Sequence, residues 1–181
     1  MGLQIEDGTG SGKTAKVSLN HQVAVRSESV DSSAIVAGRD ERYFVWQSDY
    51  AASANDIVLY IQNTDPNRLL KIRKIYLYNS GATTWEMQRV DSGTPAGTEI
   101  DALNLTFGSG INANATAYGD AAVTGTSGTT AFSYVKDAGD DHYLDANGAV
   151  IIKPFSAIQV KVTGAGTIKV YIAAYFADAG I

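Results

Sequence analysis

The chain has 181 residues, a formal net charge of −5 and no cysteine. This length predicts about one domain, and the missing cysteines exclude disulfides and thiolate metal sites, which fits assembly in a reducing cytoplasm. The acidic balance argues against nucleic-acid binding, which needs basic patches to neutralise phosphates. No apolar run approaches the roughly 18 residues that would span a bilayer, and the N-terminus lacks the apolar core of a secretory signal.

The first segment, residues 1–15, is rich in glycine, and we expect it to be an extended N-terminal arm before a single domain over residues 16–181. Apolar and polar residues alternate near its start, a period of two that suits strand addition to a partner's sheet edge. The glycines after them would form a flexible hinge that lets the arm reach across a subunit boundary. The interface residues predicted in the arm are Leu3, Ile5, Gly8, Gly10, Gly12 and Lys13.

The middle of the chain reads as a series of strands. Alternation from Lys16 to Arg26 predicts a half-buried strand, and residues 27–42 read as a polar loop. Further strands are expected at Tyr43–Trp46, at residues 56–63, which are apolar on both faces as in a central strand, and at residues 69–79. The turn Asn79-Ser80-Gly81 then predicts a hairpin with residues 83–90.

Residues 91–130 are rich in Gly, Ala, Thr, Ser and Asn. This composition predicts long surface loops with one short strand near Leu103–Phe107. Loops of this length usually bind something or are held by a neighbour. Their low complexity is equally compatible with flexibility, so both interpretations stay open.

The last third returns to strand patterns. Strands are expected at residues 132–135, 149–152, 158–162 and 168–176, and Asp145-Ala146-Asn147-Gly148 reads as a hairpin turn because Asn-Gly is its strongest short signal. About eight to ten short strands separated by turns predict an all-β protein. Because long connections between two packed sheets are expected, the favoured version is a jelly-roll-like β-sandwich.

One apparent motif is Gly8-Thr9-Gly10-Ser11-Gly12-Lys13-Thr14, which looks like a phosphate-binding loop. That loop needs a glycine where this chain has Asp7, and it needs a strand before it and a helix after it. A period-two pattern follows instead, so no helix dipole would face the phosphate. A nucleotide cofactor is therefore not expected.

Three aspartates, Asp137, Asp140 and Asp141, lie beside His142 and could suggest a cation site. Their spacing fits no EF-hand loop, and such clusters are ordinary in turns, so a solvated loop is the preferred interpretation. The other histidine is His21, and no nucleophile-elbow serine accompanies either one. No catalytic residue, metal or small-molecule substrate is predicted.

Four tyrosines lie on alternating positions of the expected strands: Tyr76, Tyr78, Tyr171 and Tyr175. They could form an interface or a carbohydrate-binding surface, because tyrosine combines apolar area with a hydroxyl. The preferred interpretation is an ordinary second core face, because the strands of a sandwich bury one face by default. Tyr171 and Tyr175 are kept as candidate interface residues.

Three stretches resemble a family of tailed-bacteriophage virion structural proteins. They are Leu3–Val17, the Asn114–Asp120 sequence NATAYGD followed by Val123-Thr124-Gly125, and the Val58–Asn63 sequence VLYIQN followed by Leu70-Lys71-Ile72. The resemblance implies a particle component on the capsid or in a fibre, with no catalytic residues.

We therefore expect a capsid decoration, or cement, protein that binds the major capsid protein on the virion surface after assembly in the bacterial host cytoplasm. By analogy with other such proteins, we expect a homotrimer. The alternative is a fibre or host-attachment module that binds cell-surface glycan through residues 91–130. A glycan-processing enzyme ranks last.

Overall fold

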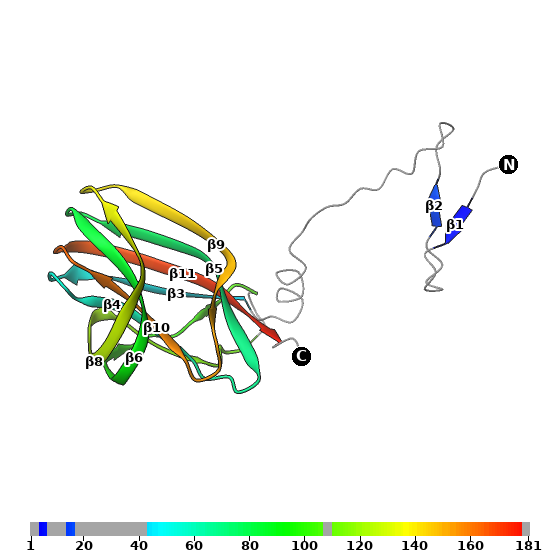
Figure 1. The fold of residues 1–181 in the computed structure, drawn as a ribbon, viewed down its shortest axis with the longest axis horizontal. Coiled ribbons are helices and arrows are strands. Elements are labelled where there is room, and N and C mark those ends of the chain that lie inside the picture. The colour runs from blue at the N-terminus through cyan, green and yellow to red at the C-terminus, as the bar shows by residue number, and fades with distance from the viewer. Residues whose placement is uncertain (1–3, 7–13, 17–42, 107–109, 179–181) are drawn as a thin grey trace. The chain divides into compact units, whose positions relative to one another are not determined.

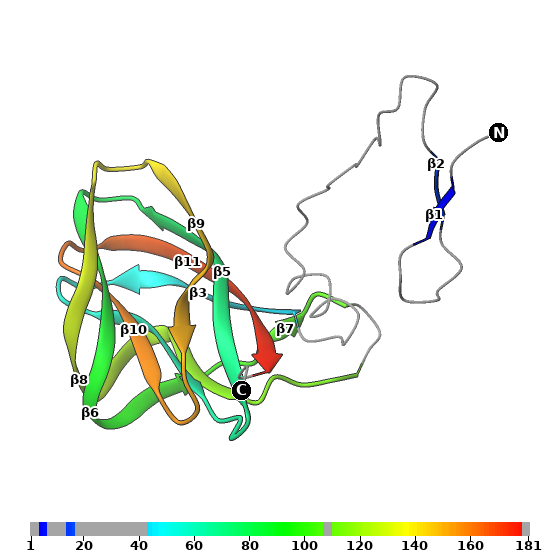
Figure 2. The same cartoon turned by 45° about the vertical axis from the view of Figure 1, so that its right-hand side comes forward.

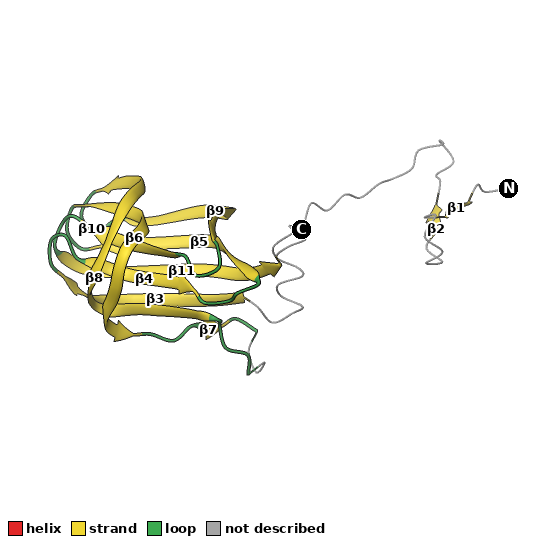
Figure 3. Ribbon diagram, turned by 60° about the horizontal axis from the view of Figure 1, so that its bottom comes forward, coloured by secondary structure: helices red, strands yellow, loops and turns green. Residues whose placement is uncertain are grey.

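The computed structural model describes residues 4–6, 14–16, 43–106 and 110–178, and in these residues all regular structure is β-strand (Figure 3). The chain divides into two units, Met1–Ser32 and Ser33–Ile181. In the first unit, β1 (Gln4–Glu6) and β2 (Thr14–Lys16) form an antiparallel pair. The predicted all-β class is confirmed. The predicted strand from Lys16 to Arg26 and the predicted loop 27–42 lie almost wholly outside the described residues.

The second unit is built from two layers of antiparallel strands (Figure 1). One layer is a five-stranded sheet in the order β7-β3-β11-β5-β9, and the other is a closed four-stranded barrel in which β10, β4, β8 and β6 pair in a ring. The strands are β3 (Tyr43–Ala52), β4 (Ile57–Asn63), β5 (Arg68–Asn79), β6 (Thr83–Glu99), β7 (Leu103–Asn104), β8 (Ala115–Lys136), β9 (Asp141–Ile152), β10 (Ala157–Val162) and β11 (Gly166–Asp178).

Alternating side chains of the five-stranded sheet point into the space between the layers. On β3, β5 and β11 the buried positions recur every second residue, as the period of a strand requires, except that a register shift on β5 separates the buried Ile72 and Ile75 by three positions. They meet apolar residues of β4, β6 and β10 in one core, which includes Phe44, Trp46, Ile75, Leu77, Val170, Ile172, Leu59, Trp85 and Val160. This β-sandwich leaves the opposite face of the five-stranded sheet outside the core.

A second, smaller cluster belongs to the barrel strands themselves. Tyr60, Val123 and Ala157 are buried together, and Tyr118 packs against them. Both faces of β4 are therefore covered, as its apolar sequence predicted.

Consecutive long strands lie in different layers, except for β6 and β8, which both belong to the barrel. Counting eight long strands along the chain, the sheet holds the first, eighth, third and sixth, and the barrel holds the second, seventh, fourth and fifth. The predicted β-sandwich is confirmed. Because the ladder between β4 and β8 closes the second layer into a ring, the jelly-roll assignment stays a prediction.

The predicted hairpin between residues 69–79 and 83–90 is wrong. β5 pairs with β11 and β9, whereas β6 pairs with β10 and β8, so the turn at residues 79–82 crosses from one layer to the other. The buried Asn79 side chain holds the crossing, because its Oδ1 accepts the Gly81 N–H at 2.9 Å. A turn sequence reports a change of direction and not which strand the chain pairs with next.

The prediction of loops over residues 91–130 is also wrong for most of that stretch. β6 continues to Glu99 and β8 begins at Ala115, and the two strands pair along much of their length with several register shifts. Small residues permit this close pairing: Gly93, with φ 102°, lies so near the carbonyl of Gly125 that an added Cβ would overlap it. The short strand expected near Leu103–Phe107 is present as β7, with Phe107 itself outside the described residues (Figure 2).

The predicted turn at Asn147-Gly148 is instead a bulge within β9. Both residues have positive φ, 46° and 77°, as their sequence suggests. However, Asp145 pairs with Lys74 and Val150 pairs with Ile72, so β9 follows the same neighbour on both sides of the bulge. The local conformation was readable from the sequence, but the absence of a chain reversal was not.

A buried polar junction connects both layers at the turn after β4. Asp65 accepts the backbone N–H groups of Asn67 and Arg68 and the side-chain amide of Asn114, and it forms an ion pair with the Arg68 guanidinium. That guanidinium also lies 4.9 Å from the centre of the Phe176 ring. Burial alone would raise the pKa of the Asp65 carboxyl, but these hydrogen bonds and the Arg68 charge lower it to about 2.

Candidate functional site

Strand register places three tyrosines in one line across the outer face of the five-stranded sheet. Tyr171 of β11 lies opposite Tyr76 of β5, and Tyr76 lies opposite Tyr143 of β9. These three residues are the tyrosine row. All three alternate with core-facing neighbours, so their side chains project away from the core.

The rings of the row stand against one another. The ring centroids of Tyr171 and Tyr76 are 5.1 Å apart with an interplanar angle of 28°, and those of Tyr76 and Tyr143 are 4.8 Å apart with an angle of 50°. Rings lying flat side by side on the sheet could not approach this closely without overlap. The row is therefore a ridge of upright rings, in which Tyr143, 72% exposed on the edge strand, is the most accessible.

One hydrogen bond fixes the centre of the row. The Tyr76 hydroxyl donates to Oδ1 of Asp141 at 2.7 Å. This bond, together with partial burial and the negative charge of Asp141, raises the pKa of Tyr76 above its ordinary value of 10. Tyr76 is therefore a neutral donor at physiological pH, and its ring is held in place on both sides by its neighbours.

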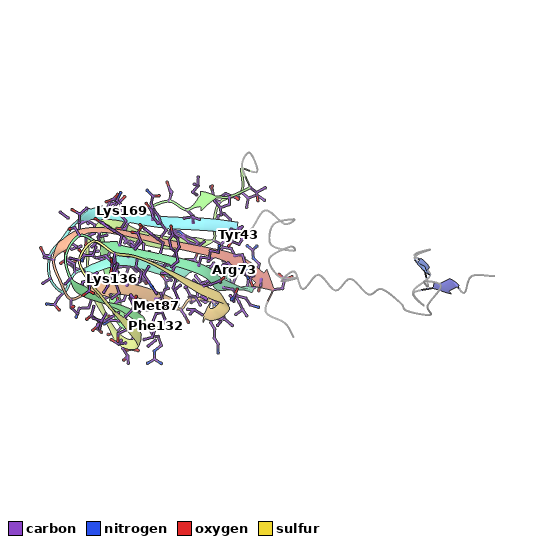
Figure 4. All side chains as sticks on the ribbon, turned by 90° about the horizontal axis from the view of Figure 1, so that it is seen from above. Tyr43, Arg73, Met87, Phe132, Lys136 and Lys169 are labelled. Atoms are coloured by element: carbon purple, nitrogen blue, oxygen red, sulfur yellow. The ribbon has the colours of Figure 1, made fainter. Side chains whose placement is uncertain are left out.

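The residues around the row carry balanced charge. The tyrosine face comprises the outward-facing residues of β3, β11, β5 and β9 that pair in four successive lines across the sheet. The charges of its three lysines and three aspartates cancel. One of these lysines, Lys169 (Figure 4), forms an ion pair in which its Nζ lies 3.6 Å from Oδ2 of Asp49. The face consists of Asp49, Lys169, Tyr78, Asp141; Gln47, Tyr171, Tyr76, Tyr143; Val45, Ala173, Lys74, Asp145; and Tyr43, Tyr175, Lys71, Ile151.

Of the two candidate tyrosines, Tyr171 lies in the row and Tyr175 lies in the last line of the face. Tyr175 is only 2% exposed, and its ring stacks on Tyr43 with centroids 6.2 Å apart and planes at 9°. The bulge of β9 approaches it closely, since a Cβ on Gly148 would lie 3.0 Å from the Tyr175 hydroxyl. Tyr175 therefore supports the face more than it offers surface.

The candidate residues of the arm belong to the first unit. Ile5 lies in β1 and pairs with Ala15 of β2. Leu3, Gly8, Gly10, Gly12 and Lys13 lie outside the described residues.

Tyr143 was not among the residues predicted from the sequence. Its signal was present, because Tyr143 alternates with His142 and Leu144 in a strand pattern. Its place in the row depends on the pairing of β9 with β5, which the misread turn at Asn147-Gly148 concealed.

The acidic cluster weighed as a cation site is split by strand geometry. Asp141 points to the outer face and accepts from Tyr76, whereas the neighbouring His142 points the other way and stacks on Tyr134, with ring centroids 3.8 Å apart. Among the described residues, no group of three or more His, Cys, Asp or Glu side chains is placed to hold a metal ion.

Comparison with protein-family models, curated proteins and solved structures gave no significant match. In the described part of the chain, no helix of the length and apolar character needed to cross a membrane is found.

Proposed function

We propose that this protein is a non-enzymatic decoration protein of a tailed-bacteriophage capsid and that its tyrosine face attaches it to the major capsid protein. The observation that supports a binding face is the tyrosine row, three aromatic rings in mutual contact on a sheet surface outside the core, of which Tyr171 and Tyr76 are stacked and Tyr143 is tilted against Tyr76. The choice of a phage capsid as partner rests on the resemblance of the sequence stretches described above.

The composition of the face favours a protein partner. Tyrosine is enriched at protein interfaces, because it buries a large apolar ring while its hydroxyl still finds a hydrogen-bond partner. The stacking and the Asp141 hydrogen bond restrain the rings before binding, so less side-chain entropy is lost on association. The face is also electrically neutral on a chain of net charge −5, and this lowers the repulsion that an acidic surface would meet.

The proposed mechanism is static. Each copy contacts the capsid through the ridge and bridges neighbouring capsid subunits, which raises the barrier to rupture of the shell. Many copies on one lattice give strong attachment through avidity even where each contact is weak.

The test is a binding assay with capsid shells assembled from a tailed-bacteriophage major capsid protein. Tyr143→Ala removes the most exposed ring of the row. Tyr134→Ala is the control, since Tyr134 is also exposed but lies on β8, where it stacks on His142, whose side chain points away from the tyrosine face. We expect Tyr143→Ala to weaken shell binding by about tenfold or more, as loss of an aromatic anchor does, and Tyr134→Ala to bind as the unchanged protein does. Shell binding by Tyr143→Ala at wild-type affinity would contradict the proposed face.

A second candidate function is favoured by one feature of Tyr143. As the last ring of the row on the edge strand, it has one ring face that no other tyrosine of the row covers, and a sugar ring can stack on such a surface. A glycan array distinguishes the two functions. Glycan binding that Tyr143→Ala removes, without binding to capsid shells, would favour a fibre or host-attachment module.

A further inference from the structure

A groove of about 660 Å³ lies between the end of β9, the connection to β10, and the barrel strands β6 and β8. Its apolar lining includes Met87 and Phe132, which are paired on neighbouring strands and lie together in Figure 4. Ile151 and Phe155 form its exposed rim. The groove is separate from the tyrosine row, although Ile151 belongs both to the tyrosine face and to the rim of the groove.

The groove borders an available strand edge. Among the described strands, β9 pairs with β5 alone, so its other side presents backbone N–H and C=O groups without a neighbouring strand. Such an edge accepts an extended segment by strand addition, and adjacent pockets take alternate side chains of that segment.

Phe155 marks the groove as more than a gap in the surface. It is 67% exposed and has φ 59°, a conformation that bulky residues rarely adopt. Its backbone N–H donates to the Asn63 carbonyl at 2.8 Å, which holds it there. A strained and exposed aromatic ring is a feature of binding sites, where the surrounding structure stabilises an unfavourable conformation.

We infer that this groove and the free edge of β9 receive the N-terminal strand of a second copy of the chain, residues 3–6. In the two-stranded sheet of the first unit, β1 pairs with β2 along one edge, so β1 would add to β9 through its other edge. Leu3 and Ile5 are two residues apart in the sequence, so an extended segment turns both to one side, toward an apolar groove. Glu6 and Asp7 follow them, and the charged residues of the groove, Arg89, Lys153 and Asp91, sum to +1. The two surfaces are complementary in polarity and charge.

The length of the chain permits exchange between copies. The 26 residues from 17 to 42 span at most about 90 Å when extended, which exceeds the roughly 40 Å diameter of a domain of this size. The choice of a second copy as the source rests on the proposed function, since a decoration protein acts as many neighbouring copies. The exchange would link those copies to one another.

The absence of cysteine in the chain allows a clean cross-linking test. Full-length Ile5→Cys is mixed with full-length Ile151→Cys that carries a mass tag, and the mixture is mildly oxidised. Ala165→Cys, exposed in the turn between β10 and β11, is the matched control partner. We expect the tagged heterodimer to form several times faster with Ile151→Cys than with Ala165→Cys.

Equal rates with both partners would overturn the inference. So would a double variant, Ile5→Cys with Ile151→Cys, that forms only an intramolecular disulfide at every protein concentration, because the segment would then dock on its own chain. No capsid is present in this assay, so its failure leaves the proposed attachment through the tyrosine face to be judged by shell binding alone.

Phe155→Gly provides an independent readout. Glycine adopts positive φ without strain and removes the aromatic rim of the groove. We expect weaker association: on dilution, followed by light scattering, the variant oligomer should dissociate at a protein concentration about tenfold higher than the unchanged protein does. Its melting temperature should be equal to or above that of the unchanged protein. A parallel loss of folding and association, or an unchanged oligomer, would contradict the role assigned to Phe155.

Discussion

The five-stranded sheet and the β6–β8 extension, the exposed part of β6 beyond Val90 with the part of β8 that pairs with it, are held together in different ways. In the sheet, every second side chain of β3, β5 and β11 enters the core, so burial of large apolar groups fixes the strands. Beyond Val90, β6 is almost entirely exposed, and the facing part of β8 is rich in Gly, Thr and Ser. The structure of this β6–β8 extension depends on main-chain hydrogen bonds between the two strands, which can approach closely because their side chains are small.

This contrast separates two tasks. The five-stranded sheet presents an aromatic face whose rings contact one another. The β6–β8 extension belongs to the closed barrel and borders the groove beside β9. A substitution that keeps the backbones of β6 and β8 apart should therefore destabilise the β6–β8 extension most. Side-chain changes on the tyrosine face should alter binding more than folding.

The largest effect is expected at Gly93. An added Cβ would lie 2.0 Å from the Gly125 carbonyl oxygen, at a φ of 102° that a side chain also disfavours. We expect Gly93→Ala to destabilise the protein by about 3 kcal/mol or more, from backbone strain and overlap together, as measured by denaturant unfolding.

Gly139→Ala is the matched control for this change. Gly139 also has positive φ, 77°, but an added Cβ meets no atom within 4 Å. A loss of only about 1 kcal/mol is expected there. Equal losses at the two positions would show that the conformation of the backbone, and not the close pairing of β6 with β8, determines the effect.

An intermediate effect is expected at Asp65, which connects the two layers. Its pKa is lowered from 3.8 to about 2 in the folded protein, so its contribution to stability is present above pH 3.8 and is lost as the pH falls toward 2. This shift corresponds to about 2 kcal/mol. We expect Asp65→Asn to lose a similar amount at neutral pH and to lack that part of the pH dependence between about pH 4 and 2.

Thermal unfolding measured across this pH range checks the prediction. Asp91 is the control, because its pKa is also lowered, through the Thr129 hydrogen bond and Arg89, but at a solvent-exposed position on β6. Asp91→Asn should leave the stability nearly unchanged. An Asp65→Asn protein with the same acid response as the unchanged protein would refute the junction's role.

The smallest effect on stability is expected at Tyr76. Tyr76→Phe keeps the stacked ring and removes only the hydroxyl that donates to Asp141, so a loss of about 1 kcal/mol is expected. Because the folded pKa of this phenol is raised, its contribution is present below pH 10 and is lost as the pH rises above that value.

Ultraviolet titration of tyrosine ionisation checks this prediction. We expect the unchanged protein to show a tyrosine that ionises at higher pH than in Tyr76→Phe. Tyr171→Phe, which lies beside it in the row, is the comparison variant. If both variants titrate alike, the Asp141 hydrogen bond does not govern the behaviour of the row.

The sequence by itself determined the all-β class and most of the strands whose side chains alternate, because burial on one face of a strand leaves a period of two in the residues. It also indicated the two positive φ angles at Asn147 and Gly148, since these are local properties of those residues.

Only the tertiary structure decided which strands pair. The crossing after Asn79, the continuation of β9 past its bulge, and the pairing of β6 with β8 all depend on contacts between residues far apart in the chain. The tyrosine row also depends on contacts between residues far apart in the chain. Tyr76 and Tyr171 could be recognised as outward-facing residues, but Tyr143 joins them only through the register between β9 and β5, and register arises from packing across the whole sheet.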